Sequence, residues 1–173
     1  VAVCAARHLH RSPWSASSLD VAPDSVEYAS MARRIAVAGQ PDIRVGGRAR
    51  PARYAPWFPA VLAPAYAAAP SEPGAGIVPV LLLACLGVAA AFLIGRQAAG
   101  DAGGVLAAVF LVHHRTFHGM ARLIMTDAPA LSLALCAVWV SVRSRRRPTH
   151  RDLAVTGALL AIAAAFRPED AVF

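Results

Sequence analysis

The pattern of apolar and polar positions divides the chain into a polar first part and a strongly apolar second part. Charged residues are densest within residues 7–53, whereas most long apolar stretches come after residue 75. These stretches cover residues 77–94, 105–112, 128–142 and 153–166. The first is close to the roughly 20 residues that a membrane-spanning helix needs. The pattern predicts an all-α fold: a polytopic membrane helix bundle of about four spans in residues 76–173, preceded by a loop in residues 1–75.

The second apolar stretch is the shortest. Its eight residues, at about 1.5 Å each, reach only about 12 Å. His113, His114 and His118 interrupt the apolar pattern directly after it. We therefore expect the polar stretch to continue the helix, and residues 96–104 to form a tight loop before it.

The first part contains two short helix patterns. Asp24 with Glu27 three residues later resembles a capping box, and Gly39 is a plausible stop, which predicts a helix over about 24–38. Residues 40–53 carry two adjacent glycines and predict a short hairpin or loop.

The second pattern starts near residue 57. Pro56, Pro59 and Pro64 exclude a long regular helix here and favour a short juxtamembrane one. Aromatic rings often anchor proteins at a membrane interface. We expect that position for the aromatic residues of this segment, Trp57, Phe58 and Tyr66.

Composition supports the membrane class and argues against nucleic-acid binding. The chain is 57% hydrophobic, above the 45–50% typical of soluble domains. Its net charge is +7, and its basic residues are all arginine. They are split among loops that helices would hold apart, whereas a nucleic-acid footprint forms one patch or stripe.

Arginine placement predicts the orientation. Five arginines in the loop at 143–151 favour the cytoplasm for that loop. Residues 7–75, 113–127 and 167–170 then face the outside. The shared sidedness of these three segments depends only on there being four crossings.

Three ionisable residues fall on this one side. Asp24, Asp127 and Arg167 are far apart in sequence, and ionisable groups at a membrane boundary are often functional. Each also has an ordinary structural interpretation. The two aspartates can cap helices, with Thr126 competing at the second, and the arginine can extend to the membrane interface.

Further candidates lie on the same side. Arg115 and Arg122 are alternative phosphate contacts, because guanidinium binds phosphate in a bidentate manner. Tyr28 and Tyr54 can line a sugar site or pack at an interface. The histidines near residue 114 can bind metal, but their spacing is unspecific and interface packing is the simpler interpretation.

Other classes of site have no sequence support. Cys4, Cys85 and Cys136 show neither metal-type spacing nor a disulfide framework. No dinucleotide-binding or phosphate-loop glycine motif appears, and no serine nucleophile elbow.

Four phrases in order resemble a known family: PDSVEYASMARRIA, RYAPWFPAVLAP, RLIMTDAPALSLAL and FRPED. They are similar to the N-terminal half of multi-spanning C-type glycosyltransferases of the dolichyl-phosphate-mannose–protein mannosyltransferase type, which includes lipid A aminoarabinose transferases. The resemblance covers about residues 20–170. Ser25 stands where many relatives carry Glu, and Glu27 can substitute in part.

The resemblance implies a reaction. A sugar would pass from a polyprenyl-phosphate donor in the membrane to an acceptor hydroxyl on a glycan, lipid or protein, outside a bacterial plasma membrane. Asp24 and Asp127 would be the catalytic acids, with Tyr28 and Tyr54 near the substrate. Arg167 and Glu169, or Arg115 or Arg122, would bind substrate, and Asp127 could hold a divalent cation.

Two alternatives stay open. The chain could be a non-catalytic membrane protein such as a transporter fragment, although a transporter favours polar groups near the middle of broken spans. It could also be an inactive truncated glycosyltransferase. A first residue other than Met and an end within an apolar phrase, at Phe173, favour a fragment.

Overall fold

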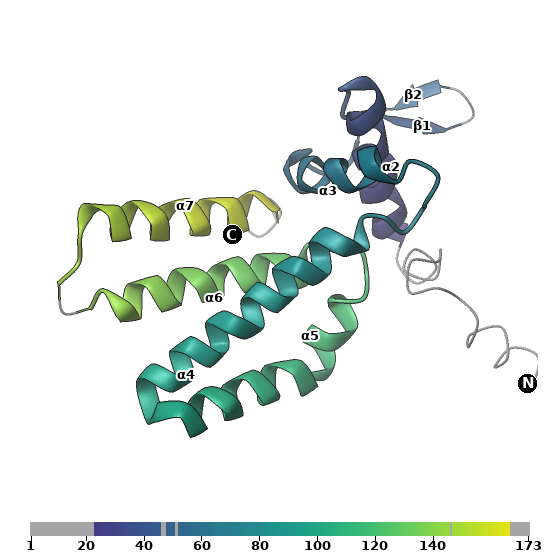
Figure 1. Cartoon of the computed structure of the whole chain (residues 1–173). Coiled ribbons are helices and arrows are strands. Elements are labelled where there is room, and N and C mark those ends of the chain that lie inside the picture. The colour runs from purple at the N-terminus through teal and green to yellow at the C-terminus, as the bar shows by residue number, and fades with distance from the viewer. Residues whose placement is uncertain (1–22, 46–47, 51, 146, 167–173) are drawn as a thin grey trace, which may run out of the picture. The chain divides into compact units, whose positions relative to one another are not determined.

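The computed structural model describes residues 23–45, 48–50, 52–145 and 147–166. The chain forms two compact units, Val1–Pro79 and Val80–Phe173. Within the described ranges the secondary structure is helical except for one two-stranded sheet (Figure 1). The predicted helical fold is thereby confirmed, while the number of membrane crossings stays a prediction.

The first helix in the described part of the first unit is α2, Pro23–Ala38. Gly39 ends it with φ of +65°, and its N–H donates to the Ile35 carbonyl at 2.9 Å. Glycine suits this left-handed position because it has no Cβ to clash. The predicted helix and its stop are both confirmed.

A β-hairpin follows this helix. Strands β1, Ile43–Val45, and β2, Arg48–Arg50, pair antiparallel, with Ile43 opposite Arg50. Arg34 of α2 reaches the carboxylate of Asp42 at 2.8 Å and so ties the hairpin's start to the helix. The expected hairpin is confirmed.

Helix α3, Trp57–Ala68, packs against α2. Phe58 and Tyr66 are each 1% exposed, and Met31 and Leu62 are buried with them in this unit's core. Only Trp57, 62% exposed, is free to meet an interface. The predicted interfacial anchoring is therefore wrong for Phe58 and Tyr66, because packing between the two helices takes up both rings.

Helix α4, Ile77–His113, is a hairpin of two helical limbs. The backbone leaves helical geometry only at Ala99 and Gly100, where glycine adopts φ of +72°, and the second limb runs back beside the first (Figure 1). A Cβ at Gly95 would collide with the backbone of Gly103. The predicted loop over 96–104 is wrong, because close-packed glycines let helix persist almost to the turn.

Three more helices complete the second unit. They are α5, Arg115–Met120, α6, Asp127–Arg143, and α7, His150–Phe166. Helix α6 lies against the first limb of α4, since a Cβ at Gly87 would overlap Ser132 and the Gln97 amide donates to the Val142 carbonyl at 3.3 Å. Helix α7 packs along α6.

These contacts define two ends of the second unit. At one end, the turn of α4 lies near the end of α6, as the Gln97 contact with Val142 requires. At the other end, Phe117 and Ala121 cluster with Ala84 and Ala128. The chain therefore returns to the second end after the α4 hairpin (Figure 1).

Within the described residues, α4 is the one helix both long and apolar enough to cross a membrane. Helices α6 and α7 have 17 residues each, about 25 Å at 1.5 Å per residue. Helix α3 is a shorter apolar helix.

Candidate functional site

Two acids on α2 contact the segment that leads into α3. Asp24 and Glu27 lie in the first two turns of α2, and Arg53 and Tyr54 come from the segment before α3. We call these four residues and Tyr28 the tyrosine–carboxylate cluster. It lies wholly within the first unit.

Aromatic packing holds the cluster together. The ring centroids of Tyr28 and Tyr54 are 4.8 Å apart, and Phe58 meets Tyr28 edge-on at 5.2 Å. Such pairs contribute about 0.5–1.5 kcal/mol beyond their burial. Tyr28 is 3% exposed, so its ring is part of the core, and the Tyr54 ring packs against it.

Glu27 fixes the other side of the cluster. Its carboxylate accepts a hydrogen bond from the backbone N–H of Arg53 at 2.7 Å. The Arg53 guanidinium lies 5.4 Å from the centre of the Tyr54 ring, within cation–π range. Glu27, the second residue of the capping-box pattern, thus makes a long-range contact next to Tyr54.

Tyr54 donates a hydrogen bond to Asp24. Burial first, and then this bond to the carboxylate, raise the pKa of Tyr54 from 10.0 to about 12. The phenol is therefore protonated at neutral pH and acts as a donor, not as a base. Asp24 is the hydrogen-bond acceptor in this contact.

Ser25 is the buried neighbour of Asp24. It is fully buried, and its hydroxyl has no hydrogen-bond partner among the described residues. The burial of Ser25 shows which face of α2 turns toward the core, and Asp24 is its neighbour in the sequence. Asp24 itself is only half-buried and so stays accessible from solvent.

A second set of candidates lies at one end of the second unit. Asp127 is the first residue of α6, where a carboxylate interacts favourably with the helix dipole. Thr126 precedes it but makes no side-chain cap. Arg122 is exposed in the turn between α5 and α6.

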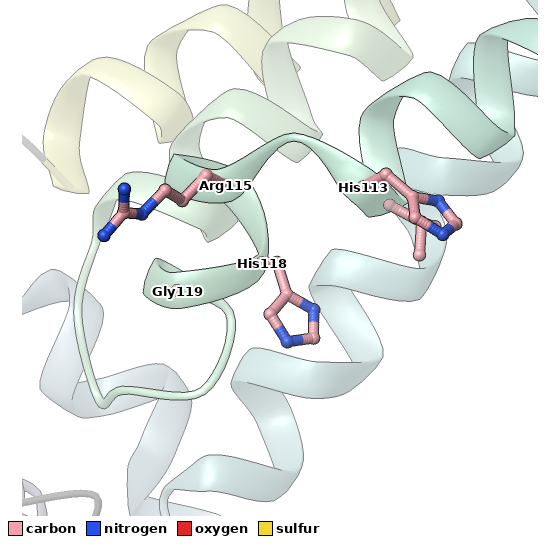
Figure 2. Close-up of a pocket in the computed structure, with 5 residues that line it drawn as sticks. His113, Arg115, His118 and Gly119 are labelled. Carbon is pink, nitrogen blue, oxygen red and sulfur yellow. The ribbon is translucent and has the colours of Figure 1, made fainter.

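Arg115 lines an open hollow of about 540 Å³ with His113 and His118. Figure 2 shows that the three side chains fan out rather than converge. His113 bonds the Val109 carbonyl at 2.9 Å, and His114 accepts from the Phe117 N–H at the start of α5. The histidine pattern therefore ends one helix and begins the next. The expected continuation of the helix through the polar stretch is wrong, because the backbone is extended at His114 between α4 and α5.

Metal ligation was open for these residues. In the described ranges, no three His, Cys, Asp or Glu side chains are grouped as metal ligands would be. We therefore derive no step through a metal ion.

Comparison with known families decides the class. The dolichyl-phosphate-mannose-protein mannosyltransferase family matches residues 55–173. The chain belongs to this family. Searches among curated proteins and among solved structures found no match.

Membership in the mannosyltransferase family implies a membrane glycosyltransferase with a polyprenyl-phosphate-sugar donor. The match begins one residue after Tyr54, so it covers Arg115, Arg122 and Asp127. Asp24, Tyr28 and Tyr54 precede it.

In this mannosyltransferase-family chain, the structure groups some predicted residues. Asp24, Tyr28 and Tyr54 meet in the first unit, whereas Arg115, Arg122 and Asp127 belong to the second. Arg167 and Glu169 lie outside the described residues.

Two contacts of the cluster were not predicted from the sequence. One is the hydrogen bond from the Arg53 N–H to Glu27, which joins residues 26 positions apart, and the other is the stacking of Arg53 on Tyr54. The only available signal was the Arg-Tyr pair directly before a proline-rich helix start.

Proposed function

We propose that this chain transfers a sugar from a polyprenyl phosphate to an acceptor hydroxyl, with Asp24 as the general base. The observation that carries the reaction class is the family match over residues 55–173. The observation that carries the residue is the bond from Tyr54 to the Asp24 carboxylate.

Asp24 would take the proton of the acceptor hydroxyl. A general base must lie within hydrogen-bond reach of the proton that it abstracts, and Asp24 is half-exposed at the start of a helix. The acceptor oxygen attacks the anomeric carbon, and a new glycosidic bond forms. The bond from that carbon to the phosphate oxygen breaks, and the phosphate leaves with the electron pair.

Tyr54 would orient the base. Because burial raises its pKa to about 12, its phenol keeps its proton at neutral pH and keeps donating to one carboxylate oxygen. The other oxygen is then directed toward substrate. Tyr28, held in the core by Phe58, would fix the Tyr54 ring.

The departing phosphate needs positive charge near it. Arg115 and Arg122 are exposed at the end of the second unit that carries Asp127, and arginine binds phosphate in a bidentate manner. Arg167 and Glu169 are further candidates from the sequence alone. Asp127, on the second unit, would be a second catalytic acid, as the family resemblance implies.

The exposed apolar side chains of the second unit support its placement in a membrane. Leu82, Leu106 and Phe110 of α4 are 66%, 70% and 72% exposed, as lipid-facing residues of a helix bundle would be. The arginine-rich loop between α6 and α7 favours the cytoplasm for that end. The α5 end, and residues 1–75, would then face the outside of a bacterial plasma membrane.

A transfer assay with a matched pair of variants tests the proposal. Full-length protein in membranes would receive polyprenyl-phosphate mannose carrying a label in the sugar, and both released polyprenyl phosphate and transferred label would be measured. Asp24→Asn should lower turnover about 10²–10⁴-fold, the usual contribution of a general base.

Asp101→Asn is the control. It removes one carboxylate from an exposed ion pair with Arg96 and should leave turnover unchanged. Equal activity of the two variants would reject Asp24 as the base. Wild-type protein that releases no polyprenyl phosphate from any donor sugar would favour the non-catalytic alternative.

A further inference from the structure

The connection between α6 and α7 forms a basic hollow that the proposed reaction does not use. About 620 Å³ in volume, it is lined by Arg143, Arg147 and Arg151 together with Thr149 and Asp152. It lies at the end of α6 that contacts Gln97, opposite the end that begins with Asp127. A ligand here would be separate from the donor sugar's proposed site.

The arginines of this hollow are available for a ligand. None of Arg143, Arg147 and Arg151 forms a salt bridge with any residue in the described part of the chain. Arg143 stacks on Trp139, with 5.5 Å from its guanidinium carbon to the ring centre. That contact fixes one side of the guanidinium of a residue that also lines the hollow.

The one carboxylate in the lining is already engaged. Asp152 accepts hydrogen bonds from the Thr149 N–H at 3.0 Å and from its hydroxyl at 2.7 Å, while the Asp152 N–H donates to that hydroxyl at 3.2 Å. This reciprocal cap starts α7. The carboxylate opposes an anion, but three cations against one acid leave the hollow positive.

Apolar surface continues directly from the charged lining. Val140 and Val155 belong to the lining itself. Val138 and Leu153, on the same two helices, are exposed. A small soluble anion would contact only the arginines. A molecule with a phosphate head and acyl chains can contact both the arginines and the apolar side chains.

We infer that this hollow binds the phosphate of an anionic phospholipid, with its acyl chains along α6 and α7. Arginine clusters at the membrane boundary attract anionic headgroups, and paired guanidinium groups fit phosphate oxygens well. We call the site the arginine hollow. It gives the protein a lipid contact at the end of α6 opposite Asp127.

Lipid retention measured by native mass spectrometry tests this inference. The full chain would be purified in neutral detergent and offered phosphatidylglycerol or phosphatidylcholine with equal acyl chains. Wild-type protein should retain phosphatidylglycerol at least about tenfold more than phosphatidylcholine. The triple variant Arg143→Gln/Arg147→Gln/Arg151→Gln should lose that preference.

A control triple variant removes the same charge elsewhere. Arg33→Gln/Arg48→Gln/Arg96→Gln alters exposed arginines outside the hollow and should keep the preference. Should the first triple fail to fold, Arg147→Gln and Arg151→Gln, both at exposed positions, would each be expected to reduce retention several-fold.

Three results would overturn the inference. They are equal retention of the two lipids by wild-type protein, equal loss of preference in both triple variants, and displacement of the lipid by millimolar inorganic phosphate alone. The second would mean general charge attraction, and the third a site for a free anion.

Discussion

The two units of this chain differ in the balance of large and small side chains that they bury. The first unit hides large rings and long apolar groups, with Phe58, Tyr66 and Met31 at most 1% exposed. The second unit hides mainly small residues such as Ala84, Ala128 and Ser132. Phe117, Ile124 and Phe166 are buried there as well, but many large apolar residues of α4, α6 and α7 are exposed.

The difference indicates the surroundings for which each unit is suited. In water, large apolar side chains are driven into the core. In lipid, leucine gains nothing from being hidden, and helices approach through small residues instead. The packed rings of the α2–α3 pair are therefore typical of a water-facing structure, and the exposed large residues of α4, α6 and α7 agree with the proposed membrane placement.

The largest expected effect comes from emptying the aromatic core. Phe58→Ala should cost about 3–5 kcal/mol of stability, the usual loss for a buried ring. Hydrogen exchange of the full chain in detergent should show lost protection in α2 and α3. Phe110→Ala, 72% exposed on α4, should change stability by less than about 0.5 kcal/mol. Similar losses in both variants would contradict the contrast.

Glycine contacts should limit the second unit. Gly95→Ala places a Cβ against the Gly103 backbone, so the limbs of α4 must separate, at a cost of about 1–3 kcal/mol. Gly157→Ala is the control, because no atom lies within 4 Å of its Cβ. That variant should gain up to about 1 kcal/mol from helix propensity. Thermal unfolding in detergent distinguishes the two, and a stabilised Gly95→Ala would rule out the close packing.

A smaller effect is expected at the start of α7. Thr149→Ala removes the hydroxyl that holds Asp152 and that lowers the pKa of this carboxyl. Amide exchange in the first turn of α7 should become about five- to tenfold faster, as for other N-cap losses. Thr156→Ala alters a threonine farther along α7 and should leave amide exchange in the first turn unchanged. The cap would be of no consequence if the two variants exchanged alike.

The smallest effect concerns alkaline pH and the first unit only. The pKa of Tyr54 is raised to about 12 by burial and by Asp24, so its stabilising contribution is complete below pH 10. It is lost as pH rises from 10 toward 12, because the unfolded chain ionises first. Burial also raises the pKa of Tyr66 to about 12, so phenolate absorbance should show two late-titrating groups, of which Tyr54→Phe removes one. Titration of Tyr54 near pH 10 would refute the Asp24 contact.

Local features of the fold were predictable from the sequence. Asp24, Glu27 and Gly39 predicted α2 to within one residue of its start, because capping and glycine stops act over a few positions. Pro129 in the first turn of α6 likewise agreed with the predicted start of that helix.

Features that depend on packing were not predictable. The α4 hairpin turns at Ala99 and Gly100 because glycines on separate limbs meet, which periodicity does not record. Apolar pattern alone also could not separate a core ring from a membrane anchor, so Phe58 was misassigned.

In the candidate site too, single residues were predictable but the contacts between them were not. Asp24 and Tyr54 were predicted as site residues, but the bond between them joins two segments that only folding brings together. The use of Glu27 to hold Arg53 could not be anticipated, because a capping pattern also explains an acid at that position. The roles of these residues in transfer stay proposals.

The reciprocal contact of Gly95 and Gly103 has a consequence for sequence drift. Each position is obstructed by the main chain of the other, which no substitution can make smaller. Compensating exchanges of a larger residue for a smaller one are therefore closed to this pair. Related chains that keep the hairpin should hold glycine at both places independently, with no correlated variation between them.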